Sequence, residues 1–179
     1  MRKWSLIAVI FILPILLCGC WDIGNDTGKK IDAQQPLLRL HIRANSNEPG
    51  DQAVKLEVRD AVCAYFTDEL SGVLDFETAK KEVAKRIAWI QRICDGILRD
   101  NGFSYQSTAN LCNEYFPTRV YGNLTVECGY YDAVVIALGN GTGDNWWCVV
   151  YPPLCYLEAE SDSDFMYKSI IAEWWSKRK

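Results

Sequence analysis

Residues Ala133–Leu138 form an unbroken apolar run in the last third of the chain, and this run constrains the fold more than any other segment. A strand made only of apolar residues must be covered on both faces, because an uncovered face would leave hydrocarbon in water. The rest of the chain must therefore supply helices or further strands around it. With 49% hydrophobic residues among 179, the chain has enough apolar side chains to do so.

Other segments also have the pattern of strands. Residues Leu38–Arg43 alternate apolar and polar side chains, which is typical of a strand with one face in the core and His41 on the solvent face. Strands are also indicated at Phe103–Phe116, at Tyr121–Cys128 and at Trp146–Tyr151, where Pro152 and Pro153 follow.

The glycine-rich segment Gly139–Asn145 lies between two of these predicted strands. Glycines at positive φ suit the tight turn of a hairpin, and we expect the segment to be one. A phosphate-binding loop is not indicated, because the Gly-Lys-Ser/Thr ending is missing and Asp144 would repel an anion.

Three helices are predicted from apolar residues at helical spacing. The first covers Asp51–Phe66, with Asp51 as its N-terminal cap, and the second begins at Asp75 and stops at Asn101. The third covers Phe165–Trp175. The order of strand, two helices, several strands and a helix predicts an α+β fold, with a mostly antiparallel sheet covered on one face by two to three helices.

The first residues have the pattern of an export leader. Residues 1–21 begin with Arg2 and Lys3 and continue with an apolar run of about 12 residues, which is short for a membrane-spanning helix but suits a signal peptide. The run ends in Leu17-Cys18-Gly19-Cys20, which resembles a lipoprotein cleavage site with Cys20 as the lipidated residue. A cleaved or retained signal peptide with incidental cysteines remains the alternative. We expect residues 22–36 to be a polar linker and residues 37–179 to be one domain.

Composition excludes several classes of function. The net charge of -4 does not suit binding to the phosphate backbone of nucleic acids. The chain has one histidine and no CxxC spacing among its eight cysteines, so we expect no metal site and no cofactor. A Ser-His-Asp or Cys-His site would have to use His41, and a solvated strand residue is the simpler interpretation, so we expect no catalytic set.

Three blocks of the chain resemble the stage II sporulation protein R family of endospore-forming bacteria: Leu40–Ser46, Phe116–Gly122 and Gly139–Tyr156. The resemblance implies a protein that is made in the forespore and exported into the space between the forespore and mother-cell membranes. There it would activate a membrane-embedded aspartic protease, which matures the mother-cell sigma factor. The resemblance supplies no catalytic residues, and it implies membrane contact only through the leader or a lipid anchor.

The residues that we expect to contact a partner lie in two of these blocks. They are Arg43, Asn45, Ser46, Asp144, Asn145, Trp146 and Trp147. Because neighbours on a strand face opposite ways, one tryptophan is expected to enter the core and the other to serve as an interface anchor, although both would be packing residues if both were buried. Likewise, Asn45 and Ser46 would satisfy the backbone at the helix entrance if they bind no partner.

The spacing of Cys148 and Cys155 across Pro152-Pro153 suggests a disulfide, and the alternative is two small buried side chains. Two other functions also remain open from the residues alone. One is a secreted cell-envelope hydrolase that uses acids such as Asp132 or Asp144, and the other is a structural envelope lipoprotein.

Overall fold

The structure is a computed structural model of the chain, and it describes residues 29–31, 36–122 and 124–154. In chain order its elements are β1 (Lys29–Ile31), β2 (Leu38–Arg43), α1 (Pro49–Glu69), α2 (Phe76–Asp100), β3 (Ser107–Phe116), β4 (Arg119–Tyr121), β5 (Leu124–Val126), β6 (Gly129–Leu138) and β7 (Asn145–Tyr151). The predicted helix at Phe165–Trp175 lies outside the described residues. Strand β1 lies within the segment that the sequence predicts to be a linker.

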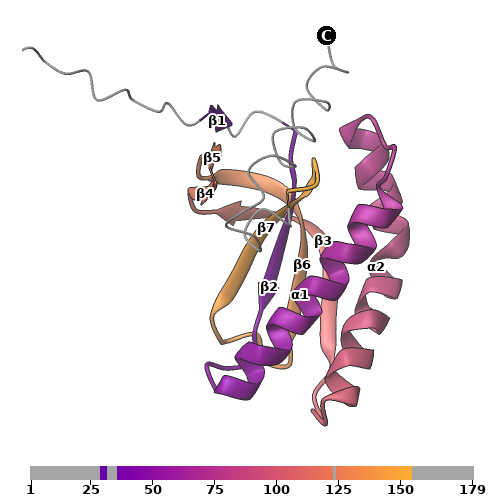
Figure 1. The fold of residues 1–179 in the computed structure, drawn as a ribbon, viewed down its shortest axis with the longest axis vertical. Coiled ribbons are helices and arrows are strands. Elements are labelled where there is room, and N and C mark those ends of the chain that lie inside the picture. The colour runs from indigo at the N-terminus through magenta and orange to yellow at the C-terminus, as the bar shows by residue number, and fades with distance from the viewer. Residues whose placement is uncertain (1–28, 32–35, 123, 155–179) are drawn as a thin grey trace, which may run out of the picture.

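The main sheet has the strand order β3-β6-β2-β7, and α1 and α2 both cover one of its faces (Figure 1). Strand β6 is antiparallel to β3, and β7 is antiparallel to β2, whereas β2 and β6 are parallel. The predicted α+β fold with a mostly antiparallel sheet is therefore confirmed. The one parallel pair of the main sheet, β2 and β6, is joined by a long connection that contains both helices and β3, as parallel neighbours require.

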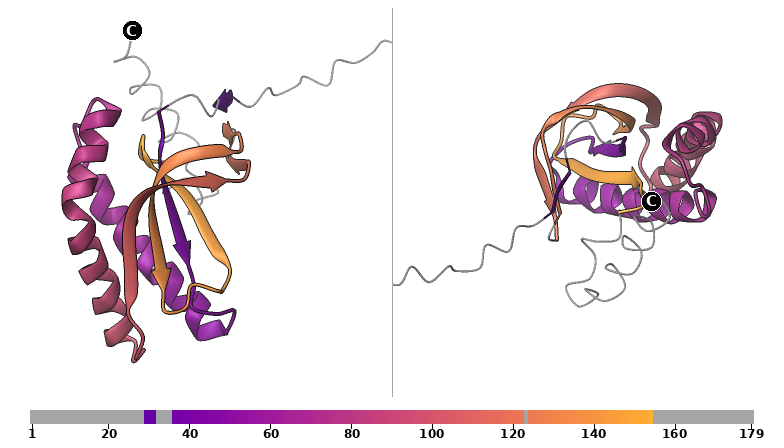
Figure 2. Two further views of the ribbon diagram at one scale, coloured as in Figure 1. Left: turned by 180° about the vertical axis from the view of Figure 1, so that it is seen from behind. Right: turned by 90° about the horizontal axis from the view of Figure 1, so that it is seen from above.

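A second sheet of three strands, β1-β5-β4, lies on the side away from the helices (Figure 2). Strands β4 and β5 continue the β3–β6 ladder in the same register, from Ser107 opposite Leu138 to Tyr121 opposite Leu124. The four strands are thus one long hairpin whose tip bends over the main sheet. The sequence indicates breaks at Pro117 and Gly122, and Gly122, with φ at 57°, turns the chain between β4 and β5, so the strand predicted from Tyr121 to Cys128 is shorter and begins at Leu124.

The bend creates a second core opposite the helices. Leu38, Leu40 and Ile42 of β2 belong to the helix-side core, together with Val134 and Ile136 of β6. The second core lies under the bent tip, and its buried members are Leu37, Phe116, Tyr121, Leu124, Val126, Tyr131, Ala133, Val149 and Leu154. The apolar run of β6 therefore contributes to both cores, which is the two-sided burial that its sequence requires.

This second core also changes the environment of β2. Its alternating pattern predicts a solvent face, yet His41 is 2% exposed and Arg39 is fully buried. The prediction of a solvated His41 is wrong because the bent hairpin covers the face on which both residues lie. Alternation reports the polarity of the side chains, and it does not show whether another part of the chain covers the polar ones.

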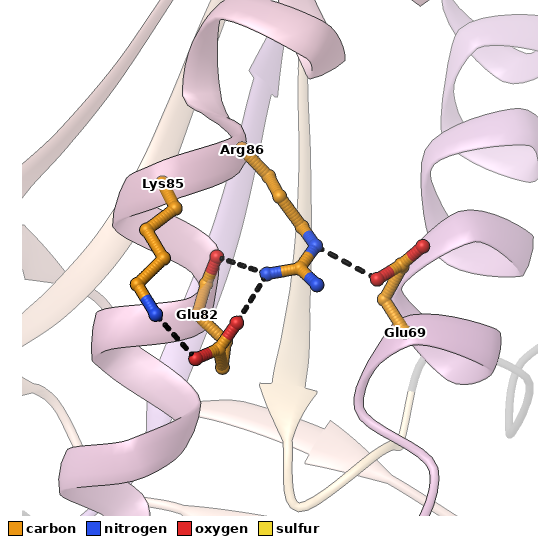
Figure 3. A network of polar contacts seen from close by, with 4 residues as sticks. All are labelled: Glu69, Glu82, Lys85 and Arg86. Atoms are coloured by element: carbon orange, nitrogen blue, oxygen red, sulfur yellow. Dashed lines mark hydrogen bonds and ion pairs between the residues drawn. The ribbon is translucent and has the colours of Figure 1, made fainter.

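The two helices begin in different ways. The carboxylate of Asp75 accepts a hydrogen bond of 2.9 Å from the backbone N–H of Thr78, which confirms it as the cap of α2. Asp51 is not the cap of α1, because the helix starts earlier, at Pro49, and its N-cap Glu48 makes no side-chain cap hydrogen bond. The helices are joined by Arg86 of α2, which contacts Glu82 on its own helix and Glu69 of α1 at 2.7 Å (Figure 3).

Arg39 occupies the centre of the second core and holds the hairpin tip against the sheet. Its guanidinium donates to the hydroxyl of Tyr121 at 2.7 Å and lies 4.3 Å from the ring centre of Phe116 and 5.1 Å from that of Tyr131. Burial lowers the pKa of Arg39, and no carboxylate among the described residues pairs with it. The cation is thus stabilised by aromatic faces, by the hydroxyl of Tyr121 and by the backbone carbonyl of Cys148, to which its Nε donates at 3.4 Å.

A cation held in this way contributes mainly by filling space, because desolvation offsets most of its attraction to the rings. We therefore expect Arg39→Met to change the free energy of unfolding by less than about 1 kcal/mol, and Arg39→Ala to lower it by about 3 kcal/mol through the cavity it leaves. Urea denaturation measures both changes. Arg92→Ala, at an exposed arginine over Trp89 on α2, is the matched control and should leave the stability nearly unchanged. Equal destabilisation by Met and Ala would contradict this assignment.

Candidate partner-binding corner

Three segments meet where β2 ends, and together they form what we name the corner: residues 43–47, the start of α1 at residues 49–55, and the loop of residues 139–145. The loop joins β6 to β7, which do not pair with each other but flank β2 on its two sides. The prediction of a hairpin turn at Gly139–Asn145 is therefore wrong. The loop instead passes around the end of β2, and this passage brings the two predicted contact segments together.

Hydrogen bonds fasten the loop to the residues that follow β2. The backbone N–H of Gly143 donates to the carbonyl of Ala44 at 2.9 Å, and the hydroxyl of Thr142 donates to the carbonyl of Asn45 at 2.8 Å. The side-chain oxygen of Asn45 accepts from the backbone N–H of Asn140 at 2.9 Å. With the bond of 3.4 Å from the backbone N–H of Thr142 to the carbonyl of Asn45, four hydrogen bonds hold the loop to residues 44 and 45.

The approach of the loop to residue 46 is close enough to require glycine. A Cβ atom on Gly143 would lie 2.2 Å from the carbonyl oxygen of Ser46, which is far inside van der Waals contact. Because the atom in the way belongs to the backbone, a larger residue at position 143 could be accepted only by moving the loop. The glycine content of the segment therefore serves the crossing of β2.

Asp51 is the polar centre of the corner. One carboxylate oxygen accepts from the Asn45 amide at 2.8 Å and from the Ser46 hydroxyl at 2.6 Å, and the other accepts from the Tyr105 hydroxyl at 2.5 Å. Burial alone would raise the pKa of Asp51, but the hydrogen bonds from Ser46, Tyr105 and Asn45 outweigh it and hold the pKa below its usual value. Asp51 therefore stays ionised and ties β2, α1 and the segment before β3 together.

Lys55 completes the corner on the helix side. Its ammonium donates to the backbone carbonyl of Asp144 at 2.9 Å and to the side-chain oxygen of Gln52 at 2.6 Å. Asp144 in turn donates its backbone N–H to the side chain of Asn47 at 2.7 Å. Burial lowers the pKa of Lys55. The backbone of Asp144 is fixed on both sides, while its side chain is exposed.

The seven residues predicted to contact a partner divide into inward and outward groups. The side chains of Asn45 and Ser46 both donate to Asp51, and the Ser46 hydroxyl also accepts from the backbone N–H of Glu48 at 3.1 Å. Asp144 and Asn145 are exposed. Arg43 is partly exposed and pairs with Glu114 of β3. Of the predicted residues within the corner, Arg43, Asp144 and Asn145 are therefore the ones whose side chains do not bind Asp51.

The two tryptophans lie on opposite faces of β7, as the strand geometry predicts. Trp146 packs against the helix-side core with the guanidinium of Arg59 4.4 Å from its ring centre. Trp147 packs against the second core, stacked on His41 with 3.7 Å between ring centres. Both rings are partly buried, so packing accounts for much of the surface of each.

The surroundings of His41 include an acidic residue that the sequence did not single out. The Nδ1 atom of His41 lies 2.8 Å from one carboxylate oxygen of Glu114, whose other oxygen contacts Arg43. Glu114, Tyr105 and the role of Asp51 as a hub were all missed. Glu114 and Tyr105 lie in a predicted strand, and their partners His41 and Asp51 are 73 and 54 positions away, so local pattern gave no signal for these contacts.

The remaining predicted positions are placed as follows. Cys148 is buried in the helix-side core, while Cys155 and Cys20 lie outside the described residues, so the disulfide and the lipidation stay predictions. Asp132 pairs with Lys80 of α2 at the opposite end of β2 from Asp144. Within residues 29–31, 36–122 and 124–154 there is no group of three or more possible metal ligands. No helix in the part of the chain that the structure describes is long and apolar enough to cross a bilayer.

The fold and the corner define a small α+β domain. A long hairpin lies bent over the main sheet, and hydrogen bonds hold a glycine-rich loop around the end of β2. The family model for stage II sporulation protein R matches residues 34–161. The chain is also 32% identical over 162 residues to stage II sporulation protein R of Bacillus subtilis (strain 168), an alignment that covers 87% of this chain and 72% of that protein. No solved structure matches the chain. The chain belongs to the stage II sporulation protein R family, and it is thus a sporulation protein.

Replacing the hub carboxylate should weaken the corner. In Asp51→Asn an amide N–H₂ must take the place of an oxygen that accepts hydrogen bonds, and we expect a loss of about 2 kcal/mol in the free energy of unfolding near neutral pH. Because folding lowers the pKa of Asp51, its contribution is complete above the pKa of the unfolded carboxyl and is lost as the pH falls through the lower, folded-state value.

The stability of the wild-type protein should accordingly fall more steeply in acid than that of Asp51→Asn. Urea denaturation between about pH 7 and about pH 3 measures the difference. Asp68→Asn, at an exposed residue near the end of the same helix, is the control and should follow the wild-type curve. Parallel curves for Asp51→Asn and the wild type would show that Asp51 is not the acid-sensitive group.

Proposed function

We propose that this protein is an exported sporulation signal that activates a membrane-embedded aspartic protease, which then removes the pro-sequence of the mother-cell sigma factor. Membership of the stage II sporulation protein R family is the observation that carries the proposal. The leader pattern of residues 1–21 supports export, and delivery to the space between the forespore and mother-cell membranes follows from the same proposal.

The corner is the surface that we assign to contact with the protease. Its internal groups already have partners: the Asp51 carboxylate accepts three hydrogen bonds, and the Lys55 ammonium donates two. A partner that binds the exposed side chains of Asp144 and Asn145 would therefore meet a surface whose backbone is held in place. Such preorganisation lowers the entropic cost of binding.

The activator role has a direct test in a host that does not sporulate. Co-expression of the full chain with the protease and the pro-sigma factor should produce the shortened sigma factor, which an immunoblot detects. Without the chain, the pro-sigma factor should stay intact. The purified chain mixed with the pro-sigma factor alone should also leave it intact, because the peptide-bond chemistry belongs to the protease. Equal processing with and without the chain would refute the proposal.

The contact surface has its own test. In Asp144→Ala/Asn145→Ala the backbone contacts of residue 144 to Lys55 and Asn47 remain, so the fold should keep its melting temperature. Processing in the co-expression assay should fall about tenfold, which corresponds to about 1.4 kcal/mol of lost binding free energy. Lys81→Ala/Lys85→Ala, on the exposed side of α2, is the matched control and should process normally. Normal processing by the Asp144/Asn145 variant would place the contact elsewhere.

A further inference from the structure

The outer surface of the bent hairpin exposes large apolar side chains. Tyr130 is 70% exposed, Val120 is 61% exposed and Tyr115 is 51% exposed. The two tyrosine rings contact each other edge to face, with 5.5 Å between ring centres, and Val120 lies beyond the bend on β4. We name these three residues the hairpin patch.

The patch is not explained by the packing of the hairpin. The second core is built by the inward side chains of Phe116, Tyr121 and Tyr131. The packing of the core therefore does not require apolar side chains at the outward positions. Six large hydrophobic residues are exposed in the described part of the chain, and half of them lie in this patch. The two tyrosines are in contact and Val120 lies on the strand that continues the same hairpin, and exposed apolar side chains concentrated on one hairpin are typical of an interaction site.

The chain reaches the bent hairpin directly from the leader. Strand β1 begins at Lys29 and pairs with β5, which in turn pairs with the strand that carries Val120. Only residues 22–28 separate β1 from the leader, and seven residues span at most about 25 Å even when fully extended. A leader that stays in a membrane, as a retained signal peptide or through a lipid on Cys20, would therefore keep the hairpin within this distance of the bilayer.

Tyrosine suits the boundary between lipid and water, because its ring is apolar and its hydroxyl keeps a hydrogen bond to headgroups or water. We propose that the hairpin patch rests in the headgroup region of the membrane that holds the leader. The net charge of -4 gives no general attraction to anionic lipid, so this contact depends on the aromatic and apolar side chains and is insensitive to salt. The sequence alone predicted membrane contact only through the leader or a lipid.

This placement also orients the corner. Tyr130 precedes Asp132, which pairs with Leu38 at the start of β2, whereas the corner follows Arg43 at the end of β2. In Figure 1, β4 and β5 accordingly lie in the upper part of the view and the turn from β2 into α1 lies in the lower part. With the patch on the membrane of the leader, Asp144 and Asn145 point away from that membrane. The inference rests on the exported, leader-tethered state proposed above, in which a protease in the opposite membrane would meet the corner first.

Photo-crosslinking to lipid tests the contact on the full chain. The protein is bound to vesicles of phosphatidylethanolamine and phosphatidylglycerol that contain a lipid with a diazirine near its headgroup. After irradiation, mass spectrometry maps the lipid adducts on the protein. We expect lipid adducts on Tyr115, Val120 and Tyr130 as well as on the leader, unchanged by added salt. Trp89, which is 49% exposed on α2, should carry none. Adducts confined to the leader would overturn the proposal.

Two variants separate the patch from the leader. In Tyr115→Ser/Tyr130→Ser the adducts on Val120 should fall several-fold while those on the leader stay, and Trp89→Ser should change neither. Contact of the patch only with a second copy of the chain, or only with the protease, detected by protein–protein cross-links in place of lipid adducts, would also overturn the proposal.

The processing assay then distinguishes the two proposals from each other. If the wild-type chain activates processing and Tyr115→Ser/Tyr130→Ser activates it equally well, the orienting role of the patch is refuted and the signalling role stands. If the wild-type chain gives lipid adducts on the patch but no processing, the signalling role fails and the membrane contact stands.

Discussion

Strand β2 lies between β6 and β7, so both of its edges are paired. Its two faces are covered by different parts of the chain. The helices cover the face that carries Leu38, Leu40 and Ile42, by ordinary apolar packing. The other face carries Arg39 and His41, and a purely apolar cover would leave the Arg39 guanidinium with the carbonyl of Cys148 as its hydrogen-bond acceptor. The bent hairpin adds aromatic rings and the hydroxyl of Tyr121 as further partners.

Local pattern predicted the elements well and their pairing less well. The apolar run Ala133–Leu138 and the helical spacing after Asp75 reflect rules that act within one segment, and both predictions are confirmed. The second core was missed because the polar residues of β2 look the same whether water or Phe116 covers them. The loop Gly139–Asn145 was misread as a hairpin because glycine permits a tight turn and a close crossing alike. The close crossing involves Ser46, which stands almost a hundred positions earlier in the sequence. A Cβ on Gly143 would lie 2.2 Å from the Ser46 carbonyl oxygen.

The candidate site shows the same division. The segments that contain Arg43 and Asp144 were predicted separately, and the structure brings them together because β7 pairs with β2 and the loop before β7 crosses the end of that strand. Which side chains face outward could not be predicted, since that depends on Asp51 drawing Asn45 and Ser46 inward. Asp51 was expected to cap α1, which is a local role. Its actual partners include Tyr105, a residue that only the folded chain places beside it.

The corner and the hairpin patch lie beyond opposite ends of β2, so the position of one determines the direction in which the other points. The corner is fixed to β2 by backbone hydrogen bonds, and the patch is fixed to β2 through Arg39 and the second core. A membrane contact at one end therefore determines the direction in which the other end points, without any change of conformation. A protein tethered only by a flexible linker would present its binding surface in every orientation, and only a fraction of encounters would be productive. If the hairpin patch binds the membrane as proposed, the domain would be restricted to orientations in which the corner lies on the side away from that membrane, and affinity for a partner there would rise because unproductive orientations are removed.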